Sequence, residues 1–357
     1  MPVDFDEQTW TQWYESLSPA EQAELAKSLE NSPRVAPQAG PQTDAFLSEA
    51  DVLGYGGAAG GGKSALIAIL ALLNHERTVI FRNDKAQMGG LIDDLVQFYG
   101  SDTGLNRQAA VFRLADRPNH VIEWGGLGAP GDQMKWRGRP HDLFCVDEAT
   151  EVPWEQVRFV QTWVRTTTPG QRCRSLYTFN PPGGPGDESG STGRWVIDYF
   201  APWLNERHPN PAVPGELRWF LRDEKGVERE ANKGDVTEVK IGDHIIEARA
   251  QSRTFIPATV VDNEYLARDG TYVSQLASLP EPYRSKMLYG DFRSGITDHE
   301  RQVIPRRGLT RRWTGGGTAT GRRGGVSATC PHSASTWHAA ATTRPFWRDA
   351  TGGTGSG

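Results

Sequence analysis

The chain has 357 residues, of which 37% are hydrophobic, enough for one large or two modest domains. No apolar run is long enough to span a membrane and no secretory leader is apparent, so we expect neither a membrane nor a secreted protein. The net charge of −5 is divided unevenly: residues 306–357 carry +7 and the preceding 305 residues carry −12. The first 305 residues are too acidic to form an extended basic surface for nucleic acid. We therefore expect any DNA contact to be local and transient.

The three cysteines, Cys145, Cys173 and Cys330, lack the spacing of a metal site and indicate a reducing compartment. Residues 1–40 predict a helical arm followed by a Pro-rich linker. Strands and helices then alternate, which is typical of a parallel sheet with helices on both faces. The expected strands are Asp51–Tyr55, Thr78–Arg82, two runs within Val111–Trp124, Asp142–Asp147 and Arg174–Phe179, and the expected helices begin at Ser64, Ala86 and Pro153, the last running to Thr166.

The segment from Gly57 to Ser64 fits the phosphate-binding pattern G-x-x-x-x-G-K-[ST]. Glycines allow backbone N–H groups to surround phosphate oxygens, and an apolar helix follows, so phosphate would lie at a helix N-terminus. Lys63 would contact the β- and γ-phosphates of ATP, and the Ser64 hydroxyl would bind Mg²⁺. The sequence therefore predicts an α/β P-loop NTPase fold, in which the backbone of Gly57, Gly60, Gly61 and Gly62 binds the nucleotide.

Two carboxylates, Asp147 and Glu148, follow a buried apolar strand about eighty residues later. We expect Asp147 to reach Mg²⁺ through water and Glu148 to polarise the water that attacks the γ-phosphate. Thr178 and Asn180 end the next strand, where polar groups can sense the γ-phosphate. Gln42, just upstream of the phosphate-loop strand, could read adenine through its amide. Arginines that could stabilise charge during phosphoryl transfer are Arg82, Arg137, Arg139 and Arg165.

The chain resembles the large terminase subunit of tailed bacteriophages, the ATPase that drives DNA into procapsids. The resembling stretches, within residues 40–300, are Gly56–Ser64, Trp136–Gly138, Asp142–Glu148, Thr178–Pro181, Thr254–Ala258, Asp262–Leu266 and Leu288–Phe292. Generic P-loop ATPases lack the later stretches. The resemblance assigns the coupling motif to Thr178 and Asn180, adenine reading to Gln42, and the catalytic and metal carboxylates to Glu148 and Asp147. It places Arg137 where a finger acting on a neighbouring subunit is expected.

The resemblance also implies ATP and Mg²⁺ as cofactors, and double-stranded DNA, the portal protein of the procapsid and a small terminase subunit as partners. It further implies a homo-oligomeric ring, no membrane, and a location in the cytoplasm of the infected bacterium. We divide the chain into an arm and linker (1–40), the ATPase domain (41–255, with an inserted hairpin near 217–248), a lid or linker subdomain (256–305) and a disordered basic tail (306–357).

The tail departs from the family pattern, in which a ribonuclease-H-like nuclease domain follows the ATPase domain. Residues 306–357 contain one Leu, one Val, no Ile and eleven Gly, too few apolar residues for such a domain. Read in a shifted frame, residues 331–350 can encode an apolar run and aspartate resembling the first nuclease strand. We therefore expect a frameshift near Pro305, whether by mutation, sequencing error or programmed slippage, and a product without nuclease activity.

Two other functions remain open at this stage. A helicase-like translocase would share the phosphate loop, but it would also have a second motor domain, which is not visible in the sequence. A decayed prophage remnant would at most bind nucleotide. Unwinding of a duplex would favour the first alternative, and lack of hydrolysis and of procapsid association would favour the second.

Overall fold

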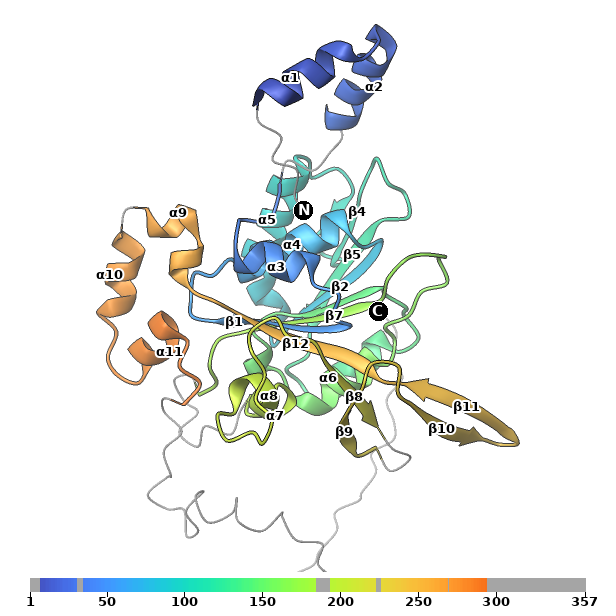
Figure 1. Ribbon diagram of the computed structural model, residues 1–357, viewed down its shortest axis with the longest axis vertical. Coiled ribbons are helices and arrows are strands. Elements are labelled where there is room, and N and C mark those ends of the chain that lie inside the picture. The colour runs from blue at the N-terminus through green and yellow to red at the C-terminus, as the bar shows by residue number, and fades with distance from the viewer. Residues whose placement is uncertain (1–6, 31–34, 184–192, 223–225, 269, 294–357) are drawn as a thin grey trace, which may run out of the picture. The chain divides into compact units, whose positions relative to one another are not determined.

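The computed structural model describes residues 7–30, 35–183, 193–222, 226–268 and 270–293 (Figure 1). The tail predicted for residues 306–357 lies outside the described residues. In the part of the chain that is described, no helix combines the length and hydropathy needed to cross a membrane. Two helices form the N-terminal arm, α1 (Glu7–Ser16) and α2 (Pro19–Glu30). The Ser18 hydroxyl and the Glu21 carboxylate cap the start of α2 reciprocally, as a capping box does.

A ten-stranded sheet forms the centre of the fold, in the order β3-β4-β5-β2-β6-β7-β1-β12-β8-β9. The strands in chain order are β1 (Val52–Gly57), β2 (Arg77–Arg82), β3 (Leu105–Asn106), β4 (Val111–Arg113), β5 (Val121–Gly126), β6 (Leu143–Val146), β7 (Arg174–Phe179), β8 (Arg218–Arg222), β9 (Glu228–Ala231) and β12 (Gln251–Ala258). All neighbours from β5 to β12 pair in parallel, and the strands outside them pair antiparallel. The predicted mainly parallel sheet is therefore confirmed.

Two apolar clusters cover the two faces of the sheet, because successive side chains of each strand point to opposite sides. On β6, Leu143 and Cys145 belong to one cluster and Phe144 and Val146 to the other. The helices of the first face are α3 (Pro41–Leu47), α4 (Lys63–Leu73) and α5 (Gly89–Tyr99); those of the second are α6 (Trp154–Gln161), α7 (Trp195–Tyr199) and α8 (Ala201–Leu204) (Figure 1). Helices thus flank the sheet on both faces, as the sequence predicts.

Helix α6 ends at Gln161, five residues before the Thr166 that the sequence predicts. The chain instead turns back to the sheet, where Val164 forms a bridge with His141. Two backbone hydrogen bonds fix this return, from His141 N–H to Trp163 O (3.3 Å) and from Arg165 N–H to His141 O (2.9 Å). Pairing with the start of β6 therefore replaces the last helical turns.

The insertion expected near residues 217–248 contains two hairpins rather than one. Strands β8 and β9 extend the edge of the main sheet beyond β12, whereas β10 (Val236–Ile241) and β11 (His244–Arg249) form a separate two-stranded sheet. After β12, a group of short helices forms the region predicted as a lid: α9 (Glu264–Ala267), α10 (Thr271–Ala277) and α11 (Tyr283–Tyr289). Four 3₁₀ turns complete the described elements: η1 (Lys85–Met88), η2 (Asp132–Trp136), η3 (Ala149–Glu151) and η4 (Val260–Asp262).

Candidate nucleotide site

The phosphate loop lies between the end of β1 and the start of α4, as the sequence predicts. Gly57, Gly60 and Gly62 have φ values of 120°, 80° and 73°, a region that side chains rarely tolerate. Gly56 is needed for a different reason, because a Cβ there would collide with the carbonyl oxygen of Phe179 on β7. The glycine content of this segment therefore follows from its backbone geometry.

The loop presents unpaired backbone donors at the helix N-terminus. Within the described residues, the N–H groups of Gly60, Gly62 and Lys63 donate to no protein oxygen. Unpaired N–H groups beside the positive end of a helix dipole suit an anion such as a phosphate group. The residues present thus fit the triphosphate of a nucleotide.

The ammonium of Lys63 is held by two protein oxygens near the loop. It donates to Ala58 O at 2.7 Å and to Oδ1 of Asn180 at 2.8 Å. Burial lowers the pKa of Lys63 to about 8, although the charges of Asp147 and Glu148 oppose this shift. Ser64 is half-buried in the first turn of α4.

The two predicted carboxylates follow β6, two positions from β1 in the sheet. Asp147 is buried and its Oδ1 accepts from the Thr178 hydroxyl at 2.5 Å and from Glu148 N–H at 3.1 Å. Glu148 has a φ of 53°, a strained value for a residue with a side chain. Burial, with the charges of Asp147 and Glu151, raises the pKa of Glu148. A carboxylate with a raised pKa is a better proton acceptor, as a general base requires.

Residues at the end of β7 link the phosphate loop to the carboxylates. Asn180 accepts from Lys63, and Thr178 donates to Asp147. The sequence predicts these two residues as sensors of the γ-phosphate, and the structure brings both into the site. Because β7 lies between β6 and β1, its carboxyl end is well placed to connect the two motifs.

Arg82, at the end of β2, pairs with the second oxygen of Asp147. Its Nε and Nη2 donate to Oδ2 at 3.0 and 2.6 Å, and its Nη1 donates to Gln87 O at 2.6 Å. Asp147 therefore accepts four hydrogen bonds, about as many as a carboxylate can take. Asp147 and the Ser64 hydroxyl are oxygen donors of the kind that Mg²⁺ prefers, but a water-mediated contact from Asp147 would displace one of these bonds.

Gln42 lies against the phosphate loop, with both ends of its amide bonded to the backbone. Its Nε2 donates to Gly62 O at 3.0 Å, and its Oε1 accepts from Gln38 N–H at 2.6 Å. In this arrangement Gln42 braces α3 against the loop. Adenine reading by Gln42 stays a prediction, and it would use the remaining amide hydrogen and lone pair.

The other candidate arginines lie apart from the phosphate loop. Arg139 pairs with Glu123, and Arg165 stacks on Trp163 with 4.9 Å between guanidinium and ring centre. Arg165 follows the bridge to the amino end of β6, the opposite end of that strand from Asp147. The side chain of Arg137 is exposed and has no hydrogen-bonding or ionic partner within the described residues. A finger role for Arg137 stays a prediction.

Sequence reasoning missed several residues whose hydrogen bonds hold the phosphate loop. Asn263 Nδ2 donates to Gly60 O at 2.8 Å, and Ala59 N–H donates to Met287 O at 2.7 Å. The Tyr55 hydroxyl donates to Gly61 O at 2.8 Å from within β1. The stretch around Asn263 was part of the family resemblance, which is the signal that could have marked it. Nothing in the local pattern marks Tyr55 or Met287.

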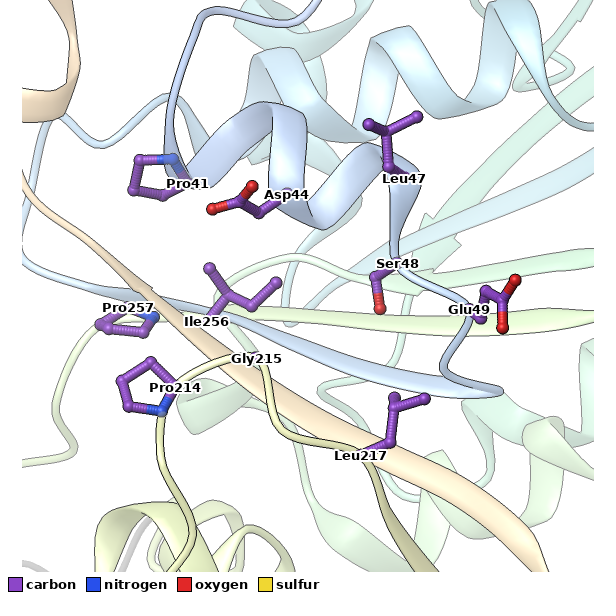
Figure 2. A pocket seen from close by; sticks show the side chains of 10 residues that line it. All are labelled: Pro41, Asp44, Leu47, Ser48, Glu49, Pro214, Gly215, Leu217, Ile256 and Pro257. Atoms are coloured by element: carbon purple, nitrogen blue, oxygen red, sulfur yellow. The ribbon is translucent and has the colours of Figure 1, made fainter. Parts of the chain in front are cut away.

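Figure 2 shows a pocket of about 550 Å³ between α3, strand β12 and the segment 214–217. Its walls include Pro41 and Asp44 of α3 and Ile256 and Pro257 of β12. None of the predicted site residues lines this pocket, although Pro41 precedes Gln42 in the chain. The phosphate site is therefore defined by its hydrogen bonds rather than by this hollow.

No protein-family profile matches the chain, and no curated protein matches it in sequence. Among solved structures, the large terminase of thermophilic bacteriophage D6E aligns with 11% identity and a TM-score of 0.44, over 71% of this chain and 53% of that chain. The ATPase domain of the Thermus phage P74-26 large terminase aligns with 15% identity and a TM-score of 0.41, over 71% and 93%. The UvsW helicase of bacteriophage T4 aligns with 13% identity and a TM-score of 0.30, over 55% and 65%.

The chain spans about half the length of the D6E terminase, at 53%. Structures of that terminase include complexes with ADP and with ATP-γ-S. Two of the three structures described above are large terminases, and the third is a helicase.

Proposed function

We propose that this chain is the ATP-hydrolysing motor of a bacteriophage DNA-packaging complex, of the large terminase type. The observation that carries the ATPase part of the proposal is the pair of hydrogen bonds at the end of β7, from Lys63 to Asn180 and from Thr178 to Asp147. They join the phosphate-binding lysine to the carboxylate motif through one strand end. Because both bonds lie at the end of β7, a γ-phosphate that binds Lys63 can change the position of this strand end.

ATP binds with its phosphates on the unpaired N–H groups of the loop. The Lys63 ammonium then exchanges Asn180 and Ala58 O for phosphate oxygens, which frees the Asn180 amide. Mg²⁺, held by Ser64 and through water by Asp147, would neutralise phosphate charge when bound. The exchange at Lys63 is the first event that distinguishes the nucleotide-bound from the free site.

In hydrolysis, a water oxygen attacks the γ-phosphorus and the bond from that phosphorus to the bridging oxygen of ADP breaks. The Glu148 carboxylate accepts the proton of the water, for which its raised pKa is suited. Phosphate release lets Lys63 return to Asn180. Thr178 lies on β7 just before Asn180 and donates to Asp147 at the end of β6, so it carries this change to the carboxylate motif.

The DNA-packaging part of the proposal rests on the motif resemblance beyond the ATPase core. It includes double-stranded DNA as the translocated substrate, a ring of identical subunits, a portal and procapsid, a small terminase subunit, and the cytoplasm of an infected bacterium. The family's nuclease activity is proposed to be absent from this chain, so purified protein with Mg²⁺ or Mn²⁺ should leave plasmid DNA intact.

DNA dependence tests the proposal and separates it from its alternatives. We expect phosphate release from ATP to increase with double-stranded DNA, and expect the protein to displace a triplex-forming strand from a duplex without unwinding the duplex itself. Unwinding would favour a helicase-like translocase instead. Nucleotide binding without any hydrolysis, alone or with DNA and procapsids, would identify an inactive remnant and contradict the proposal.

A further inference from the structure

The Tyr55 side chain lies within β1 and reaches the phosphate loop from the interior of the protein. Its ring is fully buried in the apolar cluster to which α4 also contributes. Its hydroxyl donates to Gly61 O at 2.8 Å, six residues further along the chain. Burial raises the pKa of Tyr55 above its ordinary value, so the hydroxyl keeps its proton and stays a donor. A buried tyrosine thus holds one particular carbonyl of the loop.

The bond to Gly61 O also fixes the direction of the next N–H group. A trans peptide is planar, and its C=O and N–H bonds point in opposite directions. Gly62 N–H therefore points away from the Tyr55 hydroxyl, and it has no protein acceptor in the described part of the chain. In the first turn of α4, Leu66 N–H donates to Gly62 O, so the peptide between Gly61 and Gly62 lies before the helical bonds. Its orientation rests on Tyr55.

Gln42 acts on the following peptide in the same way. Its Nε2 donates to Gly62 O at 3.0 Å, in addition to the helical bond from Leu66 N–H. Lys63 N–H, at the opposite side of that peptide, therefore points away from Gln42, and it too has no acceptor among the described residues. The contact is close, because a Cβ on Gly62 would lie 2.6 Å from Nε2 of Gln42. Two successive N–H groups are thus kept free for an anion.

We propose that Tyr55 and Gln42 are positioning residues, which orient the peptides on either side of Gly62 so that the N–H groups of Gly62 and Lys63 are directed at the phosphates before nucleotide binds. The inference rests on the proposed function, because it needs a phosphate group in the loop. Its physical basis is that donors already held in place need no reorganisation when an anion arrives. A glycine loop without these two bonds would sample many orientations and would lose part of that advantage.

The first test is Tyr55→Phe, which removes the hydroxyl and keeps the ring. Binding of ADP and of pyrophosphate, each with Mg²⁺, is measured by displacement of a fluorescent ADP analogue. We expect both to bind about two- to tenfold more weakly, as for the loss of one neutral hydrogen bond, and by the same factor because they share the phosphate contacts. The matched control is Tyr99→Phe, which removes a hydroxyl bonded to Asp116 at 2.5 Å beside the distant strand β4 and should leave both affinities unchanged.

Steady-state hydrolysis separates positioning from a general loss of stability. In Tyr55→Phe we expect KM for ATP to rise by the factor found for ADP, while kcat stays within about twofold of wild type, because Glu148 is untouched. A variant that is merely less stable has a smaller folded fraction. That lowers the apparent kcat and leaves KM unchanged.

Gln42→Leu tests the second peptide, and it keeps the inference testable should Tyr55→Phe misfold. Leucine fills a similar volume but donates nothing to Gly62 O. We expect pyrophosphate, which has no base, to bind about two- to tenfold more weakly to this variant. If Gln42 served only to read adenine, ADP would bind more weakly and pyrophosphate would bind as in wild type.

The outcomes separate this inference from the proposed function. A folded Tyr55→Phe or Gln42→Leu protein that binds pyrophosphate as tightly as wild type overturns the positioning role of that residue, and the motor remains. A wild-type protein that binds ADP but never hydrolyses ATP contradicts the proposed function, and weaker binding by Tyr55→Phe would still support the inference. A wild-type protein that binds neither ADP nor pyrophosphate overturns both.

Discussion

Asp147 accepts four hydrogen bonds, and the two from Arg82 form an ion pair with its Oδ2 oxygen. Sequence reasoning identified Arg82 only as one of several arginines, because the pairing depends on β2 and β6 being neighbours in the sheet. No local pattern around Arg82 reveals that neighbour.

We expect Arg82→Ala to lower the Mg²⁺ concentration needed for half-maximal binding of ATP, severalfold. Removing the guanidinium leaves the buried Asp147 charge without its partner, which favours a replacement cation. The measurement is a Mg²⁺ titration of fluorescent-nucleotide binding. Arg107→Ala, which removes an exposed ion pair to Asp93, serves as the control and should leave the titration unchanged. A higher Mg²⁺ requirement in Arg82→Ala would show that the pair does not compete with the metal.

The pKa of Lys63, lowered by burial to about 8, predicts a pH dependence of binding. Below that pKa the free site already carries the ammonium that phosphate requires. Above it the free site is neutral, so binding must take up a proton and affinity falls by up to about tenfold per pH unit. Isothermal titration of ADP between pH 7 and 9.5 measures this slope. Lys63→Arg keeps its charge over this range and should flatten it; an equally steep slope in that variant would exclude Lys63 as the cause.

At the scale of elements, the sequence predicted the strands and helices of the ATPase core well, because apolar strands, glycine loops and helix starts carry local signals. Sequence-based prediction failed where contacts between distant parts of the chain determine the structure. Helix α6 gives way to the bridge between Val164 and His141, and the Asn263 contact to the phosphate loop crosses 203 positions of the chain. Such contacts depend on which segments the fold brings together. A short stretch of sequence does not show this.

The close approach of β1 to β7 at Gly56 makes a prediction at this scale. Gly56→Ala places a Cβ against the carbonyl of Phe179 in the neighbouring strand, where backbone must shift. We expect a loss of about 1–3 kcal/mol or more in the free energy of unfolding, measured by denaturant titration. Gly90→Ala in α5 is the control, since nothing lies within 4 Å of its added Cβ, and it should stabilise by about 0.5–1 kcal/mol. Equal stability of the two variants would contradict the close approach.

At the scale of the whole molecule, the composition of residues 306–357 predicts that they contribute little to stability. One Leu, one Val and no Ile in 52 residues offer almost no apolar surface to bury. Removing them should change Tm by less than about 2 °C in a thermal melt of the otherwise intact chain. A drop of many degrees would show that this segment packs on the rest of the protein.

The carboxylate and phosphate-loop motifs were predictable from sequence because each follows a strand of recognisable type. Their connection was not, since it depends on β7 lying between β1 and β6. Likewise, Gln42 was singled out for adenine, but only the structure shows its bond to Gly62 O. The fold therefore brings residues that lie far apart in the sequence together into one site.

The most direct test of the central claim compares ATP binding and hydrolysis in Lys63→Ala and Glu148→Gln. The site predicts that Lys63→Ala loses both, whereas Glu148→Gln binds ATP about as tightly as wild type and hydrolyses it at least about a hundredfold more slowly, because only the proton acceptor is lost. Equilibrium binding and single-turnover phosphate release measure the two quantities. Wild-type hydrolysis that persists undiminished in Glu148→Gln, or a wild-type protein that fails to bind ATP, would contradict the account.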